Sequence, residues 1–297
     1  MDQITNENHQ SDKAHQKLSI NPRHMDFPFG SLKELKFFDN NIYKSAFMGG
    51  LSGAFPVGEK EFVDSVRNYR DKVTNPDLIK QVKGFIGQEG HHSHQHRTVN
   101  KELDRLGYNS GKVEKQLLNT IKKKLATMDN KFRLAHTVCA EHVTAIMGEY
   151  VINYPEFLEN IEQPFADLMF WHAVEEVEHK AVAFDVFMEC EDDAAYLRKT
   201  MKIAILLLHF RLTRHMFTMA FSTKHWWNMR DLFGCIKWMF GKKGMWRALR
   251  KPYKEFFDPD FHPWKAGGLE LIEKWENEYY HPEQNKASDE YLQAHPV

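Results

Sequence analysis

The chain has 297 residues, of which 42% are hydrophobic, and its formal net charge is -1. This length and hydrophobic content predict a globular protein with a large core and exclude a wholly disordered chain. The near-neutral charge provides no general attraction to nucleic acid, so we expect no nucleic-acid partner. The three cysteines form no CxxC pair, which argues against a zinc ribbon, an iron–sulfur site or a disulfide framework.

The N-terminal segment is polar and lacks the apolar stretch of a signal peptide. No run approaches the roughly 18 uninterrupted apolar residues that a membrane span needs. We therefore expect a cytoplasmic protein. Its predicted organisation is a disordered tail at 1–20, a helical bundle at 21–222, an aromatic and basic helical region at 223–281, and a second tail at 282–297.

Apolar residues recur at helical spacing, while alternating β-branched runs are missing, so the predicted fold class is all-α. The first helix is predicted to follow Pro56 and to cover 59–73. The second starts near Pro76 and stops at Gly107. Further helices are expected over 113–127, from a cap at Asp129 to about 154, from Pro164 to about 189, and over 194–221. For the remainder, 222–280, the sequence does not predict clear helix boundaries.

Two of these helices carry the same pair of metal-binding residue types. The second contains Glu89 and His92, and the one opened by Pro164 contains Glu176 and His179. A spacing of three puts both side chains of a pair on one face, one turn apart. Di-iron sites in helical bundles use two such Glu-x-x-His pairs, plus one lone glutamate from each of two other helices.

Two lone glutamates satisfy that requirement. Glu59 lies on the apolar stripe of the first predicted helix, and Glu141 lies on the small-residue face of the helix after Asp129. His172 stands one turn before Glu176 and is a candidate seventh ligand. By the same helical phase, Glu61 and Glu178 should face water.

A single Glu-x-x-His pair arises easily by chance in polar helices. Two pairs and two lone glutamates on apolar stripes are different, because unpaired carboxylates and imidazoles on buried faces cost several kcal/mol each unless they are ligated or paired. His96 and His142 lie near these faces, and helical phase leaves their participation open. The sequence thus predicts a dinuclear metal site formed by Glu59, Glu89, His92, Glu141, His172, Glu176 and His179.

Five segments resemble the bacterial family called predicted metal-dependent hydrolase, which is of ferritin-like type. They are FPVGEKEF, IGQEGHHSHQHRTVN, AEHVTA, WHAVEEVEHKAVAFDV and DPDFHPW, and the resemblance runs from about 20 to about 265. It implies a ferritin-like four-helix bundle, and the family name implies hydrolysis. The site is also similar to that of di-iron p-aminobenzoate N-oxygenases, which add a histidine where His172 stands.

Mixed carboxylate and imidazole ligands suit iron, with manganese or zinc as alternatives. We expect Glu89 and Glu176 to bridge two ions and to be the catalytic pair. The expected reaction is oxidation of a small organic, hydrophobic substrate by O2, with electrons from an unidentified donor. Two alternatives stay open: hydrolysis by a metal-activated water, and non-catalytic iron binding. We also expect a homo-oligomer.

The segment 224–254 interleaves tryptophan and phenylalanine with lysine and arginine, and Asp231 is its only acidic residue. This composition is typical of a surface that lies on a membrane or admits a lipid-like substrate. It is equally compatible with a helical subdomain that packs its tryptophans on the bundle and keeps its lysines in water.

Overall fold

The computed structural model describes residues 18–242 and 244–279, which are helical apart from loops and one isolated bridge between Phe38 and Ile161. The predicted all-α class is confirmed for this part of the chain. The helices are α2 (Ile42–Arg67), α3 (Pro76–Leu106), α4 (Ser110–Lys123), α5 (Asn130–Asn153), α6 (Gln163–Glu178), α7 (Val182–Glu191), α8 (Ala194–Ser222), α9 (Met229–Phe240), α10 (Met245–Ala248), α11 (Arg250–Glu255) and α12 (Leu269–Tyr279). Short 3-10 turns lie at Phe29–Ser31, Leu125–Thr127, Pro155–Phe157 and Pro263–Ala266.

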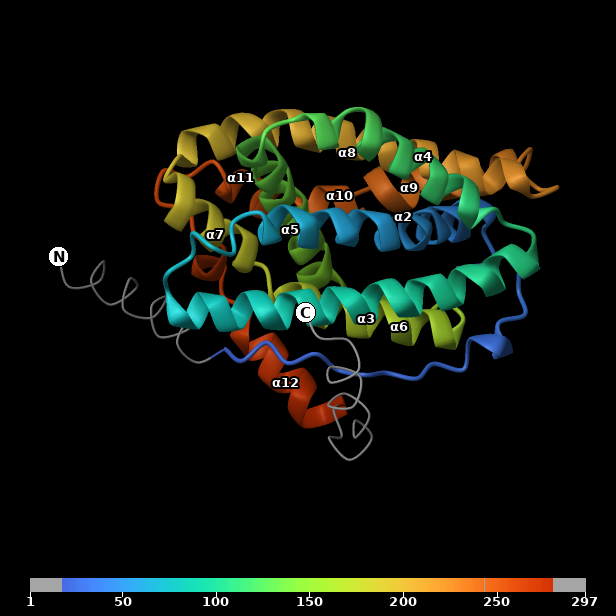
Figure 1. Ribbon diagram of the computed structural model, residues 1–297. Helices are drawn as coiled ribbons and strands as arrows, with labels where there is room; N and C mark the ends of the chain where they lie inside the picture. Colours follow the sequence, from blue (N-terminus) through green and yellow to red (C-terminus); the bar gives the residue numbers. More distant parts are fainter. Residues whose placement is uncertain (1–17, 243, 280–297) are drawn as a thin grey trace.

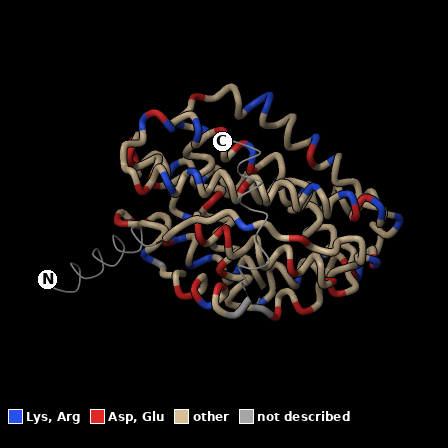
Figure 2. Tube along the Cα trace, turned by 60° about the horizontal axis from the view of Figure 1, so that its bottom comes forward, with Lys and Arg blue, Asp and Glu red and all other residues tan. Residues whose placement is uncertain are grey.

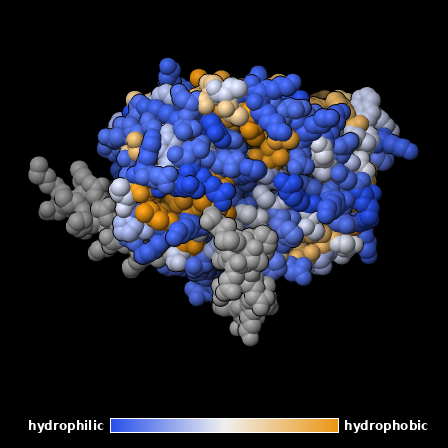
Figure 3. Space-filling view, viewed as in Figure 1, coloured by the Kyte–Doolittle hydropathy of each residue, from blue (hydrophilic) through white to orange (hydrophobic). Residues whose placement is uncertain are grey.

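The long helices form layers around a central α2 (Figure 1). α2 packs against α3 on one side and α8 on the other, while α5 packs against α6 and α8. α4 crosses over the outside of α2 and α8, and α12 lies below α6. Basic and acidic residues are distributed over the whole trace (Figure 2). The face shown in Figure 3 is largely hydrophilic, and hydrophobic residues reach it in separate patches.

The first long helix begins much earlier than predicted. α2 starts at Ile42, after Asn41 caps its first turn by accepting from the Tyr43 and Lys44 amides, and it continues through Pro56. A proline inside a helix costs about 3 kcal/mol, so the sequence around Pro56 favours a helix that starts there. Gly50 favours the continuous helix, because a Cβ there would lie 3.1 Å from the α8 backbone. Close packing on α8 thus offsets the cost of the proline.

The predictions for α3, α5 and α8 are confirmed. Asn75 caps α3 through the Asp77 and Leu78 amides, and Gly107 ends it at a φ of 115°, where a side chain would be strained. Asp129 caps α5 by accepting from the Phe132 amide. These starts and stops rest on local capping chemistry, which a sequence displays directly.

The helix predicted to run from Pro164 to about 189 is two helices. α6 ends at Glu178, and α7 begins at Val182. Lys180 lies in the break, and its ammonium binds Glu149 and the Gly267 carbonyl. Neither partner is close in sequence, so periodicity alone does not predict the interruption.

An extended N-terminal segment runs along the lower side of α3 and α6 (Figure 1). Its contact with α3 needs glycine: a Cβ on Gly84 would meet the Ile20 carbonyl at 2.1 Å, and one on Gly87 would meet Pro22 at 2.3 Å. Ile20 is buried, within the predicted tail 1–20. The rest of that tail, and the tail 282–297, lie outside the described residues apart from 18 and 19.

No helix in the described part of the chain is both long enough and apolar enough to cross a membrane.

Candidate metal centre

The seven predicted ligands lie in the interior, and each residue is at most 3% exposed. They come from four helices and the residue after one of them: Glu59 from α2, Glu89 and His92 from α3, Glu141 from α5, His172 and Glu176 from α6, and His179 from the position after α6. The incorrect start predicted for α2 does not change the position of Glu59. The direction of the Glu59 side chain depends only on the helical turn around it, and that turn was predicted correctly.

Six of the seven form two overlapping groups whose candidate ligand atoms all lie within 4.8 Å of one another. One group is Glu59, His92, His172 and Glu176, and the other is Glu89, His92, Glu176 and His179. His92 and Glu176 belong to both. Two neighbouring ions that share bridging or adjacent ligands need this kind of overlap. Glu141 lies outside both groups.

The cluster has many buried polar atoms with no hydrogen-bond partner among the described residues. These atoms are Glu59 Oε1, both Glu89 oxygens, His92 Nδ1, Glu141 Oε1, Glu176 Oε2 and His179 Nε2. Buried polar atoms are normally hydrogen-bonded, because an unpaired one costs about 1–3 kcal/mol. So many unpaired acceptors in one cluster fit metal cations, which would bind several of them at once.

His92 is held by an outer carboxylate. Its Nε2 lies 3.0 Å from Glu175 Oε2, which leaves Nδ1 directed toward the Glu89 side, 3.9 Å from Glu89 Oε2. Glu175 accepts in turn from Arg23 at 3.2 Å and from Trp171 at 3.0 Å. In a metal-binding histidine, the ring nitrogen that does not bind the metal characteristically donates its N–H to such a carboxylate, which fixes the tautomer. Glu175, which is not among the predicted ligands, therefore supports the cluster by orienting His92.

A chain of hydrogen bonds fixes the proton of His172. The side-chain NH2 of Asn100 donates to the Ser52 backbone carbonyl at 3.0 Å. The side-chain oxygen of Asn100 therefore accepts a hydrogen bond from the Ser52 hydroxyl, at 2.7 Å. The hydroxyl oxygen of Ser52 then accepts a hydrogen bond from the N–H at His96 Nδ1, at 2.9 Å. This leaves His96 Nε2 as an acceptor for His172 Nδ1, at 2.7 Å.

The consequence lies at the other nitrogen of His172. Its Nε2 carries a lone pair, yet it lies 2.8 Å from Glu176 Oε1 and 3.8 Å from Glu59 Oε1. Two lone pairs facing each other repel unless a cation or a proton lies between them. This geometry fits His172 Nε2 as a metal ligand and gives His96 the role of orienting it, which addresses the question that helical phase left open.

Glu141 contacts His179 instead of joining either group. Glu141 Oε2 lies 3.0 Å from His179 Nδ1, and His179 Nε2 faces Glu89 Oε1 at 3.4 Å. Burial acts to lower the pKa of His179, but the charge and hydrogen bond of Glu141 raise it to about 9. Burial raises the pKa of Glu141 to about 8, against the effect of His179. Glu141 is thus placed to orient His179 as Glu175 orients His92.

The predicted exposure of two neighbouring glutamates is wrong. Glu61 is buried and accepts from Arg133 Nε at 2.7 Å. Glu178 is buried beneath the N-terminal segment, where Arg23 Nη1 donates to it at 2.8 Å and Gln88 at 2.6 Å. Helical phase correctly directs both away from the metal cluster, but other segments cover those faces and supply cations.

His142 lies apart from the cluster. Its ring packs against Phe256 and Phe261, with centroids 4.9 Å and 5.3 Å away. Burial lowers its pKa to about 3. The structure thus gives His142 a packing environment and brings it to neither metal group.

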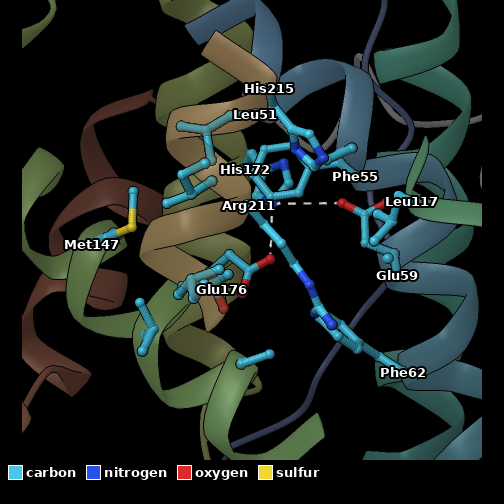
Figure 4. Close-up of a pocket in the computed structure, with 18 of the residues that line it drawn as sticks. Leu51, Phe55, Glu59, Phe62, Leu117, Met147, His172, Glu176, Arg211 and His215 are labelled. Atoms are coloured by element: carbon cyan, nitrogen blue, oxygen red, sulfur yellow. Dashed lines mark hydrogen bonds and ion pairs between the residues drawn. The ribbon is translucent and has the colours of Figure 1, made fainter. Parts of the chain in front are cut away.

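A cavity of about 150 Å³ reaches the cluster (Figure 4). Glu59, His172 and Glu176 line it, and the two carboxylates point toward the His172 ring from different helices. Most of the remaining wall is apolar and includes Phe47, Leu51, Phe55, Phe62, Leu117, Met147 and Leu212. A molecule in this cavity would reach the candidate metal site along a mainly hydrocarbon wall.

Residues 21–267 match the family described as "Predicted metal-dependent hydrolase". The chain belongs to this family. The match agrees with the resemblance expected over about 20–265, and it contains all seven predicted ligands and the cavity. No match was found among curated proteins or among solved structures. Membership in the hydrolase family supports metal dependence, and the buried glutamate and histidine cluster is where the metal would bind.

Proposed function

We propose that this member of the hydrolase family is an enzyme with a dinuclear metal centre in a ferritin-like arrangement of helices. Glu59, Glu89, His92, His172, Glu176 and His179 would hold the ions, and Glu141 and Glu175 would orient two of the histidines. The observation that carries the proposal is the convergence of unpaired ligand atoms from four helices. Two Glu-x-x-His pairs with lone glutamates from other helices are the pattern of di-iron carboxylate proteins.

For the reaction, we propose that the metal is iron and that a hydrophobic substrate is oxidised with O2; the donor set and the apolar cavity wall support this choice. Iron and manganese accept mixed carboxylate and imidazole ligands, and the bound metals would supply the activation of O2. The residues of the chain have three tasks: the ligands hold the ions, Glu175 and His96 fix histidine tautomers, and the cavity wall excludes water. An apolar wall beside the centre favours a substrate that offers hydrocarbon rather than charge at the reacting position.

Hydrolysis is the second candidate, and the family description supports it directly. Two metals can lower the pKa of a bound water and make it a nucleophile at neutral pH. His136 and His215 also line the cavity, and burial lowers the pKa of each ring to about 4, so both are neutral at neutral pH. The two reactions make different demands on the metal and on O2.

The test is to load the protein anaerobically with Fe(II) and, separately, with Zn(II). We expect about two Fe(II) per chain and, on exposure to O2, oxygen consumption with a change in absorption that the Glu176→Ala variant lacks. Turnover of p-nitrophenyl esters by the zinc form, with no reaction of the iron form with O2, would instead establish hydrolysis. A wild-type protein that binds neither metal would refute the dinuclear centre itself.

A further inference from the structure

Arg211 of α8 is a half-buried cation in a mainly apolar cavity, which Glu61, already paired with Arg133, also lines. Its side chain crosses the cavity toward Phe62 (Figure 4). Its closest described polar contact is His136 Nε2, at 3.4 Å. The buried Arg23 and the half-buried Arg133, by contrast, bind Glu178 and Glu61. Among the described residues, no carboxylate lies within ion-pair distance of Arg211.

Such a placement is costly. Even partial burial removes some of the water around a charge, and the neutral imidazole of His136 recovers little of that cost. Burial also lowers the pKa of Arg211, although an arginine stays charged at neutral pH. Because no carboxylate among the described residues pairs with Arg211, its guanidinium can bind an anion that enters the cavity.

A second polar group lies one turn further along α8. His215 is 4% exposed and lines the same cavity, and its Nδ1 has no partner among the described residues. Burial and the neighbouring arginines lower its pKa to about 4, so its ring is neutral and can donate one hydrogen bond. Arg211 and His215 together therefore offer donors, and no fixed negative charge, on the α8 side of the cavity.

We propose that Arg211 binds the anionic head group of an amphipathic substrate whose apolar body lies along the cavity toward the metal centre. This proposal rests on the proposed function in taking the cavity as the substrate site. The planar guanidinium suits carboxylate, sulfonate or phosphate oxygens, which it binds through two parallel hydrogen bonds. The substrate class is thus an acid with a hydrocarbon body.

Binding of decane-1-sulfonate and decan-1-ol to the metal-loaded protein, measured by calorimetry, tests this. A sulfonate is a weak metal ligand, so a preference for it reports on Arg211 rather than on the metals. We expect wild type to bind the sulfonate at least about 10-fold more tightly, since hydrogen bonds to charged groups contribute about 1.5–3 kcal/mol. Arg211→Met should lose this preference, and Arg211→Lys should keep part of it.

Arg214→Met is the matched control, because Arg214 lies on the same helix but is exposed. It should bind both probes as wild type does. Equal affinity of wild type for the two probes, or a preference that survives in Arg211→Met, would overturn the proposal. Metal content is measured in the same samples. Failure of the dinuclear centre would appear as missing metal, whereas failure of the anion site would appear with both metals present.

A separate observation concerns α9, which is apolar on two faces. Cys235 and Met239 are buried against the bundle. On the other side, Met229, Phe233, Ile236 and Phe240 follow one another at helical spacing, and all are exposed, Phe233 by 65%. The preceding turn adds two more exposed side chains, Trp226 and Trp227. A stripe of this length on a water-facing side marks an interaction surface.

The charges around the stripe identify the partner. Between Asp193 and Glu255, the only acidic residue is Asp231, and all other charged residues are Lys or Arg. Asp231 is buried and paired with Lys36. Arg230 and Lys237 are exposed on α9 itself. A second copy docked face to face would bring these cations against their own counterparts. An anionic lipid surface attracts them and accepts the aromatic side chains.

We infer that α9 and the turn before it dock the protein on the surface of an anionic membrane. Flotation with vesicles of phosphatidylcholine, with and without phosphatidylglycerol, tests this. Wild type should float only with the anionic vesicles, and salt should weaken binding. Phe233→Glu should abolish flotation, whereas Met128→Glu, at an exposed apolar residue of the α4–α5 connection, should not. Absence of wild-type flotation, or a dimer in solution that Phe233→Glu dissociates, would refute the inference.

Discussion

Replacing Glu176 with alanine should remove both metal ions, whereas replacing Glu59 should remove only one. Glu176 belongs to both groups of candidate ligands, and Glu59 belongs to one. The loss in affinity for Glu176→Ala should exceed the roughly 10–100-fold typical of removing a group that only orients a ligand. His92→Ala should resemble Glu176→Ala, because His92 is also shared.

Metal content after anaerobic loading and desalting, measured by elemental analysis, gives the stoichiometry. Asp167→Ala is the matched control, since Asp167 lies on α6 but is exposed and contacts Gln163 rather than the cluster. Full occupancy of both positions in Glu176→Ala would show that the cluster is not the metal site. Equal losses in Glu59→Ala and Glu176→Ala would show that the two groups do not correspond to two ions.

Arg23→Met should be the most destabilising replacement outside the metal cluster. Arg23 is 2% exposed and binds Glu175 and Glu178, which are themselves buried, as well as the more exposed Glu276. Its removal leaves two buried carboxylates without their cation, and breaking a buried pair in this way costs about 3–5 kcal/mol. At about 2–4 °C per kcal/mol for a chain of this size, Tm should fall by about 6–20 °C.

Thermal unfolding of the metal-free proteins checks this without a contribution from bound ions. Arg97→Met serves as the comparison, because the Arg97–Glu114 pair is exposed and should contribute at most about 1 kcal/mol. If Arg23→Met unfolds at the same temperature as Arg97→Met, the buried network does not stabilise the fold. In the metal-loaded protein, Arg23→Met should also bind metal less tightly, because Glu175 would no longer be fixed beneath His92.

The sequence alone determined much of the helical framework and most of the cluster. Capping residues such as Asn75 and Asp129, and the stop at Gly107, are local chemistry that does not depend on the rest of the fold. Each Glu-x-x-His pair is likewise a property of one helical turn. Helical phase therefore brought Glu89 and Glu176 inward in advance, together with their histidines.

Tertiary structure decided everything that depends on what covers a helix. Phase shows which way Glu178 points, but only the packed segment carrying Arg23, 155 residues earlier, makes that position buried. The same holds for Ser52 and His96, which set the tautomer of His172 from two different helices. Helical periodicity predicts the direction in which a side chain points from its own helix axis. Its burial, its ion pairs and, for histidine, its tautomer depend on neighbours that are distant in sequence. Arg211 carried no local signal for the same reason, since only the assembled cavity makes its charge unusual.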